Sequence, residues 1–151
     1  MAFVNPTAPN LADFETFLTT QGVPYAGLSD PAFVQYALDY AQNVALLPPA
    51  DMPAILYVLA VYNLGTHRLI RIGPDATGQT WFSTARAQYK LLSFGLGPVV
   101  ASADQGTSQT LAQPEWFKGM TISALDLAKT PWGVEYLDYA QQYGPNIVGL
   151  S

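Results

Sequence analysis

The chain of 151 residues is 50% hydrophobic and only 11% charged, with a formal net charge of −5. This length suits a single domain, and the charged fraction is well below the roughly 25% that is usual for soluble domains. Free-standing nucleic-acid-binding domains are normally basic, so the net charge argues against that class. The absence of cysteine excludes disulfides and thiolate metal sites. Two explanations fit the scarcity of charge: a compact, tyrosine-rich domain, or a surface that meets other chains.

Two amphipathic helices are predicted in the first third of the chain. Residues 1–9 are expected to form an extended N-terminal arm without a signal-peptide pattern, which indicates synthesis in the cytoplasm. Asn10 can cap a short helix over residues 11–18, and Ser29 can cap a longer helix that ends near Leu46. The expected buried stripe of the longer helix consists of Phe33, Tyr36, Ala37, Tyr40, Ala41 and Val44.

The most apolar stretch, Asp51 to Arg71, predicts the central helix of the fold. Its uninterrupted apolar run, Ala54 to Tyr62, is shorter than the ~20 residues that a membrane span needs. We therefore expect a buried core helix, capped by Asp51, and no membrane contact. Gly65 inside this helix costs about 1 kcal/mol relative to alanine, which a closely crossing neighbour or a kink would explain.

The following segments are less regular. Thr80 can cap a helix from Trp81 to Phe94, which the glycines after it would stop. Residues 97–113 break the helical pattern and predict a hairpin or long-loop insertion around Asp104-Gln105-Gly106. A turn and a short helix from about Thr121 are expected to follow.

The last helix has the clearest start and stop signals. Thr130-Pro131 forms an N-cap and first-turn pair, and Gly144-Pro145 ends the helix after Tyr143. Residues 144–151 are expected to form an extended C-terminal tail. The sequence thus predicts one mainly α domain over residues 1–151, a bundle of five or six helices around the central apolar helix, with one hairpin or long-loop insertion. The aromatic stripe of the last helix, more often core than ligand site, consists of Trp132, Tyr136, Tyr139 and Tyr143.

No residue pattern indicates catalysis, a cofactor or a metal. His67 is the single histidine, and a lone histidine is more often a structural or surface residue than a base; no nucleophile elbow accompanies it. Glu135 and Asp138 have no histidine near them in sequence, so a solvated helix face is the default interpretation. The glycines of residues 93–97 lack the Lys-Ser/Thr pair of a phosphate loop. We predict that the protein is not an enzyme and has no cofactor and no metal.

Two clusters could serve a partner. Trp116 and Phe117 lie in a loop, and must be buried either in the protein's own core or against a partner. Between His67 and Lys90, four cations stand against Asp75 alone, whereas the rest of the chain has two cations and ten carboxylates. This basic cluster, either a solvated face or a functional patch, consists of Arg68, Arg71, Arg86 and Lys90.

The segment Lys129 to Tyr143, KTPWGVEYLDYAQQY, resembles the C-terminal motif of the head-to-tail connector (adaptor or head-completion) proteins of tailed bacteriophages. In that family a Thr-Pro-aromatic-Gly run opens a final helix, with a further aromatic a few residues later. The order of helices is also similar over most of the chain, although a helix as long as residues 81–94 departs from the family's pattern. The matching positions are Thr130, Pro131, Trp132, Gly133 and Tyr136.

The resemblance implies a structural virion protein at the head-to-tail junction. Copies would form a homo-oligomeric ring, a dodecamer in the family, that binds the portal protein and a tail or neck protein. The ring would extend the channel, so that packaged DNA passes through the lumen without sequence recognition. The basic cluster would face a neighbouring subunit or the lumen. The residues expected at the portal or partner interface are Trp116, Phe117, Ile147, Val148 and Leu150.

Three alternatives remain open. The protein could be a tail-completion or neck component that contacts the tail tube of the same particle. It could instead be a small all-α module that binds a ligand or peptide between its tyrosine-rich faces. An enzyme is the least favoured class, because the sequence offers one histidine and no catalytic motif.

Overall fold

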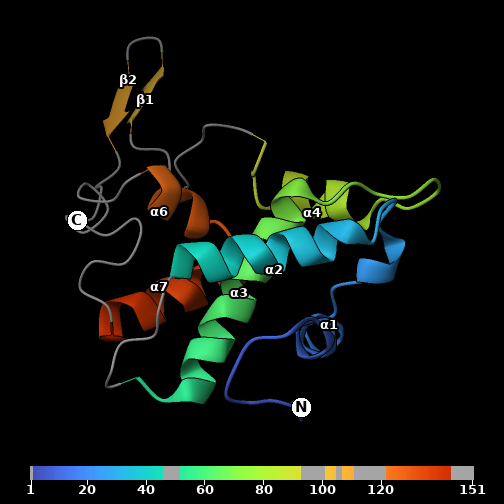
Figure 1. Ribbon diagram of the computed structural model, residues 1–151. Coiled ribbons are helices and arrows are strands. Elements are labelled where there is room, and N and C mark those ends of the chain that lie inside the picture. The colour runs from blue at the N-terminus through green and yellow to red at the C-terminus, as the bar shows by residue number, and fades with distance from the viewer. Residues whose placement is uncertain (1, 46–51, 93–100, 105–106, 111–121, 144–151) are drawn as a thin grey trace.

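The computed structural model describes residues 2–45, 52–92, 101–104, 107–110 and 122–143. The fold is mainly helical, as the sequence predicts, and is organised around one central helix, α3 (Figure 1). Four other helices pack against α3, while α6 packs against α7. The described helices are α1 (Leu11–Thr20), the 3₁₀ helix η1 (Tyr25–Gly27), α2 (Ala32–Ala45), α3 (Ala54–Ile72), α4 (Trp81–Gln88), α6 (Ile122–Leu127) and α7 (Pro131–Tyr143).

Helix α3 is buried on all sides in its middle, because its apolar residues leave no polar face. Every residue from Ala60 to His67 is buried, which confirms the prediction of a central core helix. Within the described residues, no helix is both long and apolar enough to cross a membrane. Pro53 stands at the N-cap without a side-chain hydrogen bond, and the predicted cap, Asp51, lies outside the described residues.

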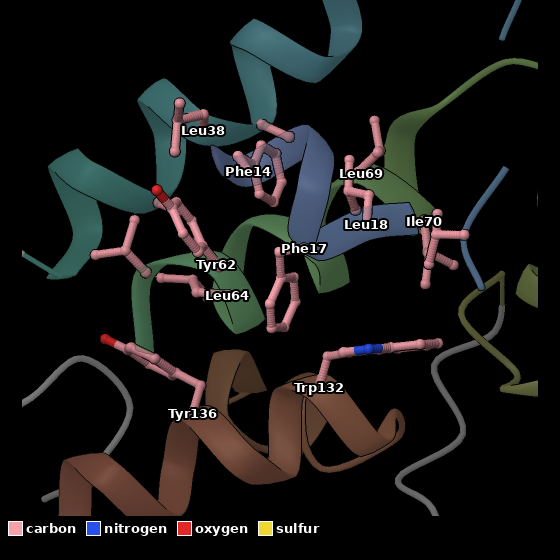
Figure 2. Packing of buried hydrophobic residues seen from close by; sticks show 14 of the residues in the cluster. Phe14, Phe17, Leu18, Leu38, Tyr62, Leu64, Leu69, Ile70, Trp132 and Tyr136 are labelled. Atoms are coloured by element: carbon pink, nitrogen blue, oxygen red, sulfur yellow. The ribbon is translucent and has the colours of Figure 1, made fainter. Parts of the chain in front are cut away.

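Gly65 of α3 lies where α1 and α2 come close. Of the two predicted explanations for this glycine, a closely crossing neighbour or a kink, the structure shows the neighbour. A Cβ atom on Gly65 would stand 2.9 Å from Cζ of Phe14 and 3.6 Å from the carbonyl oxygen of Ala37. The Phe14 ring also stacks on the Tyr62 ring, with 5.5 Å between centroids. Figure 2 shows Phe14, Phe17 and Leu18 of α1 among the core side chains of α3. Glycine at this position therefore allows the aromatic side of α1 to reach the α3 backbone.

The N-terminal arm is held against α1 by one buried carboxylate. Asp13 accepts the backbone N–H groups of Val4 and Asn5, both at 2.8 Å, while Asn10 caps the helix by accepting the Asp13 N–H at 2.9 Å. Burial raises the pKa of Asp13, but its hydrogen bonds from Asn5, Asn10 and Val4 outweigh burial and lower it overall. Farther along the arm, Phe3 meets the Tyr62 ring edge-on. The predicted Asn10 cap is confirmed.

Helix α2 differs from its prediction in its cap. The Asp30 carboxylate accepts the Ala32 N–H at 2.9 Å, whereas the Ser29 N–H donates to the carbonyl of Pro74 at 3.0 Å. Ser29 as the cap was therefore wrong, because the side chain of Asp30, the residue directly before Pro31, accepts the first-turn N–H instead.

The buried face of α2 is also rotated relative to the predicted stripe. Tyr36 and Tyr40 are 56% and 39% exposed, so placing them in the buried stripe was wrong. The tight crossing at α3 accepts small side chains in the centre of the contact, and the tyrosine hydroxyls remain near water. The residues of α2 that are buried are Val34, Ala37, Leu38 and Ala41.

Helix α4 takes its N-terminal cap from a distant loop. Thr80 makes no side-chain capping bond, so its predicted role was wrong. Instead, the Asp75 carboxylate accepts the backbone N–H groups of Phe82 at 2.9 Å and Ser83 at 2.8 Å. An acceptor that precedes the helix by several residues replaces the local cap because the chain turns back between them.

Helix α4 also ends at Gln88, well before Phe94. Lys90 adopts a positive φ of 58°, and the N–H groups of Lys90 and Leu91 return to the carbonyls of Ala87 and Arg86. These are the two hydrogen bonds of a Schellman motif, with lysine where glycine is usual. The prediction that the later glycines stop this helix was therefore wrong.

The sequence predicted a hairpin or a long loop over residues 97–113, and the described residues of this segment form a hairpin. Strands β1 (Ala101–Asp104) and β2 (Thr107–Thr110) pair antiparallel, with Asp104 opposite Thr107. After the insertion, α6 and α7 begin within one residue of their predicted starts. The predicted tail over residues 144–151 lies outside the described residues.

Candidate functional site

The residues that resemble the connector motif form the corner between α6 and α7. Thr130 is the N-cap of α7: its Oγ1 accepts the Gly133 N–H at 3.0 Å, and Pro131 occupies the first helical position. This is the geometry that the Thr-Pro pair predicts, because proline lacks the N–H that a first-turn residue would leave unpaired. The Thr130 side chain is 1% exposed, so the corner lies inside the fold.

Gly133 is required by the close approach of two backbone segments at this corner. A Cβ atom at this position would stand 1.9 Å from the carbonyl oxygen of Leu127 and 2.7 Å from its carbonyl carbon. Since a backbone carbonyl cannot move aside as a side chain can, only glycine fits here without shifting α6 against α7.

Trp132 and Tyr136 point from α7 toward α3 and α1, as Figure 2 shows. The Trp132 indole donates its Nε1–H to Oε1 of Gln21 at 3.1 Å, and its ring meets Tyr89 edge-on at 6.1 Å. Of the predicted aromatic stripe of α7, these two residues are buried, whereas Tyr139 and Tyr143 are partly exposed. Two aromatic side chains therefore fix the orientation of α7 on the core.

The Tyr136 hydroxyl is buried and has no hydrogen-bond partner among the described residues. Burial raises the pKa of this phenol to about 12, with smaller contributions from the phenols of Tyr40 and Tyr57. A buried hydroxyl without a partner is unusual, because it loses its hydrogen bonds to water.

His67 of α3 joins the corner through both ring nitrogens. Its Nδ1 lies 2.7 Å from Oγ1 of Thr130, and its Nε2 lies 3.0 Å from Oδ2 of Asp126. If Nε2–H donates to the carboxylate, Nδ1 accepts the Thr130 hydroxyl proton, and the neutral imidazole satisfies every polar group of the array. Spacing alone could not reveal these partners, because they lie 59 and 63 residues away in sequence.

The order Thr130–His67–Asp126 has the connectivity of a catalytic triad. However, the histidine is 3% exposed and the threonine 1% exposed, and the hydroxyl already accepts the Gly133 N–H. A nucleophile must reach its substrate, and this hydroxyl is enclosed. The array is therefore suited to hold α7 on α3, and the prediction that the protein is not an enzyme stays a prediction.

Asp126 is the centre of charge at the corner. Besides His67, its carboxylate accepts a hydrogen bond from Nη1 of Arg71 at 2.8 Å and lies 3.8 Å from Nζ of Lys129. Burial raises the pKa of Asp126, but the hydrogen bond and charge of His67 and the charges of Arg71 and Lys129 outweigh it and lower the pKa. Arg71 and Lys129 also donate to the carbonyls of Leu91 and Lys90. The network thus connects α3, α6 and the turn after α4.

The arginines Arg71 and Arg86 of the basic cluster have acceptors inside the fold. Arg71 bonds Asp126, and Arg86 donates to the carbonyls of Ile70 and Gly73 at the end of α3, where cations stabilise a helix. Arg68 instead lies over the Tyr40 ring, 4.4 Å from its centroid, and Lys90 is exposed in the turn. A role of the cluster toward a neighbouring subunit or a lumen stays a prediction.

The residues predicted at the portal or partner interface lie outside the part of the chain that the structure describes: Trp116, Phe117, Ile147, Val148 and Leu150. Within the described ranges, no group of three or more histidine or acidic residues could hold a metal ion.

A second surface, the α2 face, was missed because its aromatics were assigned to the core. It consists of Phe33, Tyr36 and Tyr40 of α2 together with Arg68 of α3. Phe33 and Tyr36 meet edge-on, with 5.6 Å between centroids, next to the Tyr40 ring that carries Arg68. Exposed aromatics beside an arginine are typical of protein interfaces.

No protein-family model, curated protein or solved structure matches this chain.

Proposed function

We propose that the protein is a structural virion component of a tailed bacteriophage, an adaptor that forms a ring between the portal and the tail or neck and extends the DNA channel. One observation carries the proposal. The first four residues of the connector-like run, Thr130, Pro131, Trp132 and Gly133, form the start of α7 at the corner with α6, and the fifth, Tyr136, is buried in the core one turn later.

The corner supports an adaptor because it fixes where α7 points. The Thr130 cap, the Gly133 contact with α6 and the Trp132–Gln21 hydrogen bond hold the first turn from three directions. A helix held in this way can present its exposed side at a set position on the domain. An adaptor needs such a fixed geometry, since every copy in a ring must repeat the same contacts.

The composition of the surface also supports an assembled role. The chain is only 11% charged, and the α2 face exposes two tyrosines that could have been buried. Tyrosine and arginine are enriched at the centres of protein interfaces, whereas isolated monomers rarely expose contiguous aromatic surface. DNA that passes through a ring without being read requires no basic domain, so the net charge of −5 is compatible with this role.

The decisive experiment is genetic. A virus that lacks this protein should produce heads filled with DNA but without tails, and a wild-type copy supplied in trans should restore tailed particles. Normal tailed virions without the protein would reject the proposal. Cross-linking within virions then separates the adaptor from a neck component: an adaptor should cross-link to the portal, and a neck component to the tail tube alone.

A further inference from the structure

Arg68 differs from the other arginines of the described structure in lacking an acceptor within the fold. Arg71 pairs with Asp126, and Arg86 donates to the carbonyls at the end of α3. In the described ranges, no carboxylate lies within ion-pair distance of Arg68, and its guanidinium stands over the Tyr40 ring instead. A half-buried cation held in place by an aromatic ring is preorganised to accept a carboxylate from outside.

The rest of the α2 face is apolar around this cation. Tyr36 and Tyr40 are 56% and 39% exposed, and Phe33 packs against the Tyr36 ring. The acidic residue of α2, Asp39, accepts a hydrogen bond from Gln35 of the same helix at 2.8 Å. The α2 face therefore offers large aromatic area and one cation, and the exposed carboxylate of Asp39 lies one residue before Tyr40.

The outer face of α7 carries charge of the opposite sign. Val134 is 50% exposed, and Glu135 and Asp138 beside it are exposed carboxylates, while α7 contains no cation. Asp138 lies four residues after Val134 and three after Glu135, so it neighbours both on one side of the helix. In the described part of the chain, neither carboxylate has a cation within ion-pair distance. The outer face of α7, defined by Val134, Glu135 and Asp138, thus presents an apolar centre and two carboxylates without a cation partner in the described residues, although Asp138 accepts a hydrogen bond from Gln142 at 3.0 Å.

We propose that these two unlike faces bind each other between copies, with Arg68 of one subunit placed against Glu135 and Asp138 of the next and with Tyr36 packed on Val134. The second copy is the occupant because the charges and the apolar areas are complementary. Both helices pack on α3 with their inner sides, which leaves both outer faces available (Figure 1). Contacts between unlike faces are heterologous, and they form a ring when the rotation closes. This inference rests on the proposed adaptor function, whose subunit contact it assigns.

Charge reversal on the purified chain tests the contact. Sedimentation velocity should show concentration-dependent association of the wild-type chain. Both Arg68→Glu and the double variant Glu135→Lys/Asp138→Lys should weaken the association at least about tenfold, because each places like charges opposite each other. The triple variant that combines them should associate again, since the pair is restored with its signs exchanged. Glu15→Lys, the same kind of charge change on α1, is the matched control and should leave association unchanged.

Thermal melting of every variant verifies that it folds. This check matters most for Arg68→Glu, because Arg68 is half-buried over the Tyr40 ring, whereas Glu135 and Asp138 are exposed. A wild-type chain that stays monomeric up to about 1 mM, the weak end of specific binding, overturns the proposal. So does an association that charge reversal leaves intact, or a triple variant that does not recover. The genetic test is independent. Tailless heads together with an association that charge reversal leaves unchanged would keep the adaptor function and reject this contact. Normal tailed virions together with an association that charge reversal weakens would keep the contact between copies and reject the adaptor function.

Discussion

Gly65 in α3 and Gly133 in α7 both lie inside helices at points where another segment comes close, but the approaching groups differ. A Cβ atom on Gly65 would meet the tip of the Phe14 ring at 2.9 Å, whereas a Cβ atom on Gly133 would meet the Leu127 carbonyl oxygen at 1.9 Å. A ring can tilt and repack, whereas the Leu127 carbonyl is part of the backbone at the last residue of α6 and can move only if the corner between α6 and α7 moves with it. The first contact is therefore deformable, and the second is fixed.

The two regions also differ in what surrounds the contact. At the junction of α1 and α3, aromatic rings of Phe14 and Phe17 surround Tyr62, and the attraction is mainly apolar. At the α6–α7 corner, His67 and Asp126 hold the helices with hydrogen bonds and charges. In the first region the ionised Asp13 holds the N-terminal arm, whereas in the second region the ionised Asp126 joins the helices themselves. Loss of the Asp126 charge in acid should therefore weaken the contact of α6 with α3 directly.

Gly133→Ala should have the largest effect. The added methyl group cannot be accommodated beside the Leu127 carbonyl, so α7 must shift away from α6, and we expect a loss of about 3 kcal/mol or more in the free energy of unfolding. Urea denaturation followed by circular dichroism measures the change. Gly27→Ala is the matched control, because its Cβ atom would lie 3.7 Å from its nearest neighbour. A loss below 1 kcal/mol would show that the corner is as deformable as the α1–α3 contact.

Asp126→Asn should have the next largest effect, about 2 kcal/mol at neutral pH, because the charged acceptor of His67 and Arg71 becomes a neutral amide. Its pH dependence identifies the cause. The pKa of Asp126 in the folded state lies below its ordinary value of 3.8, so its contribution is present above pH 3.8 and is lost as the pH falls through the lower folded-state value. The difference between wild type and variant should shrink over that window. A difference that stays constant would mean that the corner does not depend on this charge.

Gly65→Ala should cost only about 1 kcal/mol. The added methyl group gains about 1 kcal/mol in helix propensity but crowds the Phe14 ring, which typically costs about 1 to 3 kcal/mol. Combining it with Phe14→Leu should recover part of the loss, because the smaller side chain vacates the space. No recovery in this double-mutant cycle, measured by urea denaturation, would mean that the α1–α3 contact is as rigid as the corner.

The residues that local chemistry controls were predictable from the sequence. The apolar run of α3, the Asn10 cap and the Thr130-Pro131 start each depend on a few neighbouring residues, and each is found where it was expected. For Gly65 the sequence left two explanations open, a close neighbour or a kink, and the structure shows the close neighbour.

What depends on distant residues was not predictable. The partners of His67 come from α6 and the α6–α7 corner, and the cap of α4 comes from Asp75, so neither appears in any local pattern. The rotation of α2 follows from how closely it crosses α3, which exposes the tyrosines of the α2 face. The end of α4 was missed because Lys90 adopts a backbone conformation that usually marks glycine.

Tyr136→Phe should have the smallest effect, and of the opposite sign. The buried hydroxyl of Tyr136 has no partner in the described structure, so its removal should stabilise the protein by about 1 kcal/mol. Tyr62→Phe is the matched control on the apolar side: its hydroxyl accepts the Asn10 N–H at 3.1 Å and donates to the Asn10 carbonyl at 3.3 Å. That variant should lose about 1 kcal/mol.

Alkaline pH makes the Tyr136 comparison sharper. The pKa of the Tyr136 phenol is about 12 in the folded protein and 10.0 ordinarily, so the unfolded chain releases this proton at a lower pH than the folded protein does. The free energy of unfolding therefore falls as the pH rises from 10 toward 12. Tyr136→Phe should therefore lose less stability than the wild type over that window, although Tyr57, Tyr62 and Tyr139, with raised pKa values, cause losses in both proteins. If the variant is instead less stable at neutral pH, the hydroxyl has a hydrogen-bond partner, and the contact of α7 with α3 is more polar than its apolar neighbours indicate.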